Sequence, residues 1–204
     1  MKKVLVIVLV IAMSAALFGC GSASPSDVVD TYLGALKAQD AETVAKVYSG
    51  DSGADLLSDV TESDEFPEEI YSDFTDMILS FDYSLSNEQI SGDSATVDVT
   101  IDTYDFGSMF KSVIGDYFTK AFGMAFSGAS EDEIEQVLVD LFVDKLAEMK
   151  EGEHDFEATA TISLSKVDGE WKINAIDDDS DFINCLTGDM TSALTDISDS
   201  FDME

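Results

Sequence analysis

Alternation of apolar and polar residues along one stretch of the chain constrains the fold more than any other feature of the sequence. Between Ala95 and Ile101 every second residue is apolar, and the residues between them are Thr or Asp. Period-two alternation places all the apolar side chains on one face of a β-strand. The stretch therefore predicts a strand of an antiparallel sheet that is buried on one face and exposed to water on the other.

The residues before this strand predict the other half of a hairpin. Phe81, Tyr83 and Leu85 also alternate with polar residues. A Ser-Gly-Asp-Ser turn at residues 91–94 joins the two strands. Ile90 falls on the opposite parity from Leu85, which predicts a β-bulge between these two residues.

A second hairpin is predicted closer to the C-terminus. Apolar residues alternate again from Phe156 to Leu164. Asp168-Gly169, a dipeptide typical of a type I′ turn, precedes Trp171 and Ile173 on the returning strand. Strands with one apolar face must be covered by amphipathic helices. The predicted fold class is therefore α+β, with a four-stranded antiparallel sheet made of two hairpins.

Amphipathic helices are predicted before the first hairpin. The first occupies residues 25–38, with Ser24 as its N-cap and a proline at its first position. A short second helix begins after Asp40, and a third opens near Pro67. Residues 49–65, which are rich in acids and glycine, are predicted to form the loop between them.

A helical pair is predicted between the two hairpins, as an insertion at residues 107–152. Its first helix carries aromatic residues at helical spacing from Phe110 to Phe126. Ser130 begins a capping-box sequence that opens the second helix. Aromatic residues at this spacing are typical of a core, and an apolar groove lined by Phe118 and Phe122 is the alternative.

The residues after the second hairpin carry an acidic run and a last helix. Oxygen ligands make Asp177–Asp181 a candidate calcium site, but the run lacks the sixth-position Gly and twelfth-position Glu of a helix-loop-helix site. A capped, solvated helix start is favoured, and no metal site is predicted. Helical spacing from Phe182 to Phe201 predicts one terminal helix, with residues 189–204 as an acidic helix or tail. Cys185 is expected to be a buried, unreactive thiol.

The N-terminal residues have the pattern of a secretory signal peptide. Met1-Lys2-Lys3 is basic, and Val4 to Met13 is almost entirely aliphatic. Spanning a bilayer takes about 20 apolar residues. The apolar run from Val4 to Phe18 is shorter than that, which favours a cleaved leader over a membrane-spanning anchor.

A cysteine directly follows the leader, in Leu17-Phe18-Gly19-Cys20. This motif resembles the lipobox of bacterial lipoproteins. The resemblance implies that residues 1–19 are removed as a signal peptide and that Cys20 is alkylated by diacylglycerol. Residues 20–24 would then be a lipidated tether, and the folded part would lie on the extracytoplasmic face of the cell membrane.

Acidic residues dominate the charge of the chain. Asp and Glu number 43, Lys numbers 10 and Arg is absent, for a formal net charge of −33. Nucleic-acid binding requires a basic surface, so this class of function is excluded. Charged partners are expected to be cationic, such as metal ions, polyamines or basic peptides. Solubility alone is the favoured interpretation, because the acids are spread along the chain rather than gathered in one block.

Several segments together resemble a known group of proteins. These are residues 25–36 with Asp40 after them, the hairpin around Gly92, and residues 166–173. They resemble small lipoproteins of Gram-positive bacteria with a cystatin-like or nuclear-transport-factor-2-like fold. The resemblance implies a domain at residues 25–188 in which the N-terminal helices pack into the concave face of a curved sheet.

One histidine is the main candidate for proton-transfer chemistry. His154 stands beside Asp155 before a predicted strand. Enzymes of the cone-shaped fold place His, Asp and Tyr inside the cavity, which makes Tyr83 and Tyr104 candidate pocket residues with Phe118 and Phe122. A solvated loop position is the favoured interpretation of His154, and no catalytic residue is predicted. No motif for a cofactor, a phosphate or an activated nucleophile occurs in the chain.

Three functional hypotheses follow. The first is a non-catalytic, membrane-anchored lipoprotein that binds a small ligand or an envelope partner through the concave face of the sheet. The second is a cavity enzyme with proton-transfer or dehydratase-like chemistry at His154 or a buried Asp, with Tyr83 or Tyr104. The third is a structural envelope protein whose acidic surface attracts cations.

Lipidation gives the first testable prediction. Cells that express the wild-type chain and are fed a fatty-acid analogue should label the protein, because a diacylglyceryl group carries acyl chains. The Cys20→Ala variant should take up no label. In-gel detection of the analogue measures both, and equal labelling of the two chains would contradict the lipobox assignment.

Overall fold

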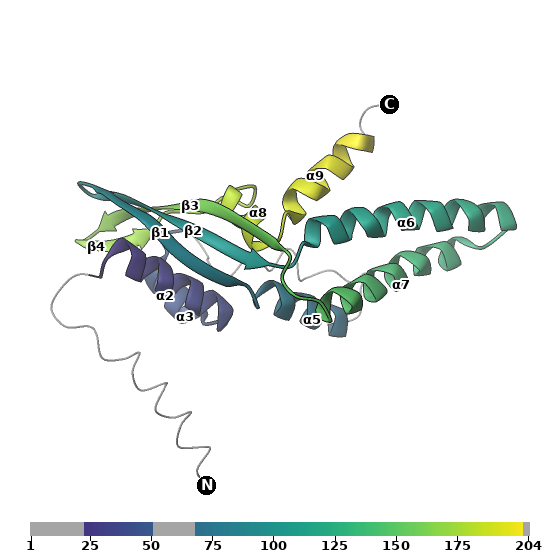
Figure 1. Cartoon of the computed structure of the whole chain (residues 1–204), viewed down its shortest axis with the longest axis horizontal. Coiled ribbons are helices and arrows are strands. Elements are labelled where there is room, and N and C mark those ends of the chain that lie inside the picture. The colour runs from purple at the N-terminus through teal and green to yellow at the C-terminus, as the bar shows by residue number, and fades with distance from the viewer. Residues whose placement is uncertain (1–22, 51–67, 202–204) are drawn as a thin grey trace, which may run out of the picture.

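The computed structural model describes residues 23–50 and 68–201 (Figure 1). The predicted signal peptide, Cys20 and most of the predicted loop at 49–65 lie outside these residues. Within the described part of the chain, no helix is both long and apolar enough to cross a membrane.

A four-stranded antiparallel sheet forms the centre of the fold. Its strands β1 (Asp82–Ser91), β2 (Ser94–Thr103), β3 (Phe156–Val167) and β4 (Glu170–Ile173) lie side by side in chain order. Each pairs with its neighbours in antiparallel register. The predicted α+β class, with two hairpins and helices before and between them, is confirmed. The alternating residues of β2 from Ala95 to Ile101 are all buried, as their period requires.

The predicted bulge is present in β1. The register between β1 and β2 shifts between Ser86 and Gln89, so that two residues of β1 oppose one residue of β2. Asn87 has a φ of 51° there. The next residue, Glu88, accepts a hydrogen bond from the backbone N–H of Ser26 at 2.8 Å. The bulge therefore directs a carboxylate from the sheet to the first turn of the neighbouring helix, where negative charge is stabilising.

The two N-terminal helices end and begin where their caps predict. Helix α2 (Pro25–Lys37) starts after Ser24, whose hydroxyl accepts from the N–H of Asp27 while the Asp27 carboxylate accepts from the N–H of Ser24. These hydrogen bonds lower the pKa of Asp27. Helix α3 (Ala41–Val47) follows the cap Asp40. Beyond α3, Tyr48 forms a parallel bridge with Ile173, so the chain covers the outer edge of β4.

The main core lies between the apolar face of the sheet and its helices. Helices α2, α3 and α8 (Asp181–Leu186) pack on this face, and α2 and α3 lie beneath the strands in the view of Figure 1. Tyr32 and Leu33 are fully buried, and their helix α2 contacts β1, β2 and β4. The face on which a ligand or partner was expected is therefore filled by the chain's own helices.

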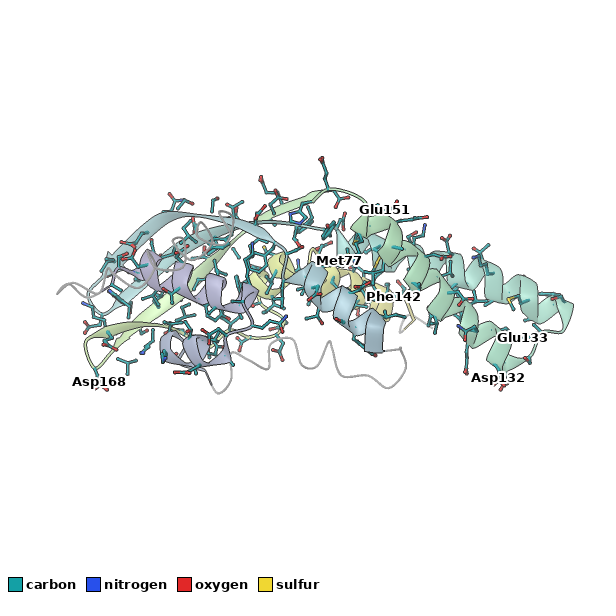
Figure 2. The ribbon with its side chains drawn as sticks, turned by 90° about the horizontal axis from the view of Figure 1, so that it is seen from below. Met77, Asp132, Glu133, Phe142, Glu151 and Asp168 are labelled. Carbon is teal, nitrogen blue, oxygen red and sulfur yellow. The ribbon has the colours of Figure 1, made fainter. Side chains whose placement is uncertain are left out.

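A second core lies beyond the end of the sheet. Helices α6 (Phe106–Ser127) and α7 (Glu131–Lys150) form an arm that extends away from the strands in Figure 1. Helix α5 (Glu68–Ile78) packs at its base, where Met77 and Phe142 are buried in one cluster (Figure 2). The capping box predicted at Ser130 is confirmed.

The C-terminal region differs from its prediction as one helix. It forms α8 and, after a break, α9 (Met190–Phe201). Gly188 and Asp189 both have positive φ values, 52° and 62°, which end α8. The break lets the backbone of Gly188 lie against Tyr104 and Gly107, and the N–H of Gly107 donates to the Gly188 carbonyl at 2.7 Å. Helix α9 then packs against α6, with Met190 buried in the second core.

Substitution of Gly188 tests the contact at this junction. A Cβ at Gly188 would lie 1.9 Å from the Tyr104 carbonyl oxygen, in a left-handed conformation. Gly188→Ala should therefore lower the free energy of unfolding by about 3 kcal/mol, from clash and backbone strain together. Urea denaturation followed by far-UV circular dichroism measures the change.

Gly123→Ala is the matched control for this substitution. Gly123 lies inside α6, and a Cβ there would meet nothing within 4 Å. Because Ala favours a helix over Gly, Gly123→Ala should raise the free energy of unfolding by about 0.5–1 kcal/mol. A Gly188→Ala protein as stable as wild type would contradict the close contact at the junction.

Candidate functional site

The aromatic stripe of α6 divides into a buried part and an exposed part. Near the sheet, Phe106, Met109 and Val113 lie in the second core. Toward the end of the arm the exposed fraction rises from 49% at Phe118 to 69% at Phe122 and 79% at Phe126. The expected core role therefore holds for the face of α6 that meets the second core, where Tyr117, Ala121 and Met124 stay half-buried. The alternative, an apolar groove, describes the face that carries Phe118, Phe122 and Phe126.

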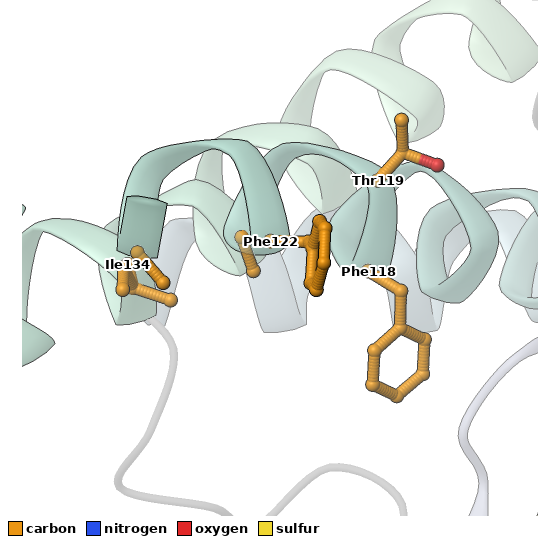
Figure 3. A pocket seen from close by; sticks show the side chains of 6 residues that line it. Phe118, Thr119, Phe122 and Ile134 are labelled. Carbon is orange, nitrogen blue, oxygen red and sulfur yellow. The ribbon is translucent and has the colours of Figure 1, made fainter. Parts of the chain in front are cut away.

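The exposed part of the stripe borders an open apolar groove of about 660 Å³. Figure 3 shows Phe118, Thr119 and Phe122 of α6 and Ile134 of α7 along it. The rings of Phe122 and Phe126 are in contact, with their centroids 4.7 Å apart. The structure thus brings two of the four candidate pocket residues, Phe118 and Phe122, into one surface.

The groove is open because its phenylalanines lie on a face of α6 that turns away from the second core. The buried residues of α7, Leu141, Phe142 and Leu146, lie toward the base of the arm. Its first turn instead consists of acids, and Glu131, Asp132 and Glu133 are exposed. Figure 2 shows Asp132 and Glu133 at the far end of the arm. Ile134 is the residue that α7 contributes to the lining of the groove.

Charge at this end of the arm is mostly negative. Residues 116–135 contain five Asp or Glu and one Lys, Lys120. The carboxylate of Glu133 accepts from the backbone N–H of Ser130 at 2.8 Å and from its hydroxyl at 2.9 Å. These hydrogen bonds lower the pKa of Glu133, so it stays ionised at neutral pH.

The third candidate pocket residue, Tyr83, lies on β1 beside α2. Its hydroxyl donates to the carboxylate of Asp30 at 2.8 Å. Partial burial, with this hydrogen bond and the nearby charge, raises the pKa of Tyr83 to about 12. The phenol is therefore protonated at neutral pH and attaches β1 to α2.

The fourth, Tyr104, lies at the junction of sheet and arm with the only histidine. The rings of Tyr104 and His154 meet edge to face with centroids 4.7 Å apart. Nδ1 of His154 is 3.8 Å from Oδ1 of Asp102, and 18% of its side chain is exposed. His154 is thus more enclosed than a solvated loop residue.

An open cleft of about 370 Å³ runs beside this His-Tyr-Asp cluster, along Tyr104, Asp105 and Glu148. The acids near the cleft have structural partners. The Asp105 carboxylate caps α6 by accepting from the N–H of Ser108 at 2.7 Å, and the Asp155 carboxylate accepts from the N–H of Asp105 at 2.9 Å. An acid and a tyrosine do converge here, but at an open surface.

Two further sequence candidates have structural roles. Ser180 caps α8 by accepting from the N–H of Ile183, so the predicted helix start at Asp177–Asp181 is confirmed. Among the described residues, no group of three or more His, Cys, Asp or Glu side chains is arranged to hold a metal ion. Cys185 is buried, as expected, and burial raises the pKa of its thiol, which disfavours the reactive thiolate.

Comparison with known proteins gives one structural match. No protein-family model and no curated protein matches the chain. Among solved structures, the chain is similar to YcdA of Bacillus subtilis, which is described as a lipoprotein, with 16% sequence identity and a TM-score of 0.44. The match covers 78% of this chain and 51% of YcdA, so the chain spans about half the length of that protein. The cystatin-like or nuclear-transport-factor-2-like assignment stays a prediction.

The sequence identified Phe126 as the last residue of the aromatic stripe, but it did not single out Ile134 as a site residue. Phe126 is exposed because it lies on the face of α6 that turns away from the second core, whereas Tyr117 on the other face is half-buried. Helical spacing alone does not say which face of a helix meets its neighbour.

A buried polar group in the main core is Tyr32. It is fully buried and stacks on Tyr48 with ring centroids 5.8 Å apart, and among the described residues its hydroxyl has no hydrogen-bond partner. Burial, with the neighbouring Tyr48, raises the pKa of Tyr32 above its ordinary value of 10.0. The hydroxyl therefore costs free energy without serving a binding site.

Tyr32→Phe should stabilise the protein. At pH 7 it should raise the free energy of unfolding by about 1 kcal/mol, because an unpaired buried hydroxyl is removed. Above about pH 10 the unfolded tyrosine ionises while the native one keeps its proton. Wild-type stability then falls by about 1.4 kcal/mol per pH unit from this residue, and the variant escapes that loss.

Urea titrations at pH 7 and pH 11 measure both effects. Tyr83→Phe is the control, because it removes a hydroxyl that is bonded to Asp30 and should lower stability by about 1 kcal/mol at pH 7. A Tyr32→Phe protein less stable than wild type at pH 7 would mean that the hydroxyl has a partner.

Proposed function

We propose that the chain is a lipid-anchored lipoprotein of the outer face of the cell membrane that acts by binding another envelope component. The binding surface is the groove at the end of the arm. The observation that carries this proposal is the exposure of Phe122 and Phe126 beside an apolar groove on a projecting helix pair. Large exposed apolar patches on soluble domains typically mark interaction sites.

The sequence of the N-terminus supports the anchoring part of the proposal. The basic start, the short apolar run and the Leu-Phe-Gly-Cys motif all precede the folded region. Two acyl chains hold a protein on a membrane far more durably than one. Figure 1 shows the start of α2 at one end of the long axis and the turn between α6 and α7 at the other. An anchor before α2 would leave the arm free to reach a partner.

The packing of the sheet supports the arm, rather than the concave face, as the binding surface. The apolar side chains of β2 and β3 are buried beneath α2, α3 and α8. No comparable cover lies over Phe122 and Phe126 among the described residues.

Proton-transfer chemistry is the second candidate function. The contact of His154 with Tyr104 and Asp102 favours it, because these are the groups that a general acid or base requires. The open cleft beside them argues against it, since catalysis of this kind benefits from a site that excludes water.

Photo-crosslinking in the producing cells tests the binding role. A benzophenone amino acid replaces Phe122 in one strain and Ile90 in another. Ile90 is a matched control because 57% of its side chain is exposed, on the sheet rather than on the arm. Illumination should give a discrete adduct of higher mass from position 122 and none from position 90, as read on a denaturing gel. The absence of an adduct at 122, or the same adduct at both positions, would contradict the proposal.

A further inference from the structure

We infer that the groove at the end of the arm binds a cationic amphipathic helix of a partner protein. This inference rests on the proposed function and adds the chemistry of the partner. It is carried by three properties of the described residues: the size of the apolar patch, its linear shape along α6, and the sign of the charge around it.

The patch has the size that one helix can cover. Phe118, Phe122 and Phe126 together expose on the order of 400 Å², given about 200 Å² for each Phe side chain. A standard protein interface buries about 800 Å² on each partner. An apolar patch of half that size, with a polar rim, matches the insertion of a single amphipathic helix better than the docking of a whole domain.

The patch is also linear. Its three phenylalanines are four residues apart, so they follow one line along the surface of α6. Thr119 and Gly123 lie on the same exposed part of the helix, and a Cβ at Gly123 would meet nothing within 4 Å. Small side chains beside the line of phenylalanines leave room for another helix to approach closely. The partner would present apolar residues at a spacing of three and four.

Charge around the groove selects the sign of the partner. Glu131, Asp132, Glu133 and Glu135 are exposed on the helix that contributes Ile134 to the groove. Lys120 is the single cation of residues 116–135. Lysines on a bound segment would meet these carboxylates, and such complementarity gives specificity and fast association.

The same charge disfavours the other occupants. A second copy brings a formal net charge of −33, and an anionic bilayer is negative as well. Residues 51–67 of the chain itself contain six Asp or Glu and no Lys. A second copy, an anionic bilayer or the 51–67 segment would each place negative charge against the exposed carboxylates of residues 131–135. Such repulsion costs free energy.

A designed peptide provides the test. The probe is an 18-residue fluorescent peptide of Leu and Lys in which Leu recurs at three- and four-residue spacing. The protein is the chain purified from the membranes of its producing cells and held in phosphatidylcholine nanodiscs. Empty nanodiscs correct for binding of the peptide to lipid, and fluorescence anisotropy gives the Kd. A peptide of the same composition in scrambled order lacks the apolar face and should bind at least tenfold more weakly.

Variants of the apolar patch locate the site. Phe122→Ala with Phe126→Ala should weaken binding at least tenfold, because large aromatic residues dominate interface energies. Ile90→Ala with Val167→Ala removes exposed apolar side chains from the sheet, where 57% and 47% of these residues are exposed, and should leave the Kd unchanged. Far-UV circular dichroism checks that each variant is folded.

Variants of the acidic rim test the charge. Asp132→Asn with Glu135→Gln should weaken binding about threefold at low salt, and the difference should vanish at 0.5 M salt because of screening. Asp93→Asn with Asp168→Asn removes two charges at the hairpin turns and should have no such effect. Asp168 lies at the opposite end of the molecule from Asp132 in Figure 2.

Several results would overturn the inference. Equal Kd values for the arm and sheet variants, or for the ordered and scrambled peptides, would show only general attraction of a cation to an acidic chain. A wild-type chain that sediments as a dimer, with a Phe122→Ala variant that sediments as a monomer, would assign the groove to a second copy. Binding of the nanodisc-held protein to added anionic vesicles would assign the groove to lipid, if the Phe122→Ala variant loses that binding. An adduct from position 122 without peptide binding would leave the proposed function intact and refute only the chemistry of the partner.

Discussion

Close backbone contact at the junction of sheet and arm is the constraint on which the rest of the structure depends. The chain leaves β2 at Tyr104, enters α6 at Phe106 and returns between α8 and α9 at Gly188. A carbonyl oxygen of the first segment lies where a Cβ of the third would be, and one backbone hydrogen bond joins α6 to the turn. This contact fixes α9 beside α6 and holds the two cores next to each other. The position of the arm follows from it.

Local patterns predicted most of the fold. The alternation from Ala95 to Ile101 fixed the buried face of the sheet, the parity of Ile90 placed the bulge, and Ser24 and Ser130 marked two helix starts. Each of these features involves residues close together in the chain. The break at Gly188 was missed because apolar spacing continues through it, and the reason for the break is a contact with Tyr104, which is distant in sequence.

The candidate site was predictable only in part, for the same reason. Helical spacing identified Phe118 and Phe122 as members of an aromatic stripe, but it could not say which part of the stripe is covered. That depends on which face of α6 meets the second core, and the exposed phenylalanines lie on another face. The meeting of His154 with Tyr104 and Asp102 likewise depends on the pairing of β2 with β3, which the order of the two hairpins in the sequence left open.

Both edges of the sheet carry a feature that hinders the addition of further strands. The bulge at Asn87 interrupts the hydrogen-bonding row of β1, and the N–H and hydroxyl of Ser49 both donate to the Ile173 carbonyl at the edge of β4. Unprotected strand edges join readily to one another and cause aggregation. Lipid-anchored molecules are confined to a plane and collide often, so a sheet with open edges would tend to polymerise laterally there. For a chain anchored as proposed, hindered edges would reduce such lateral joining when the molecules are crowded on a surface.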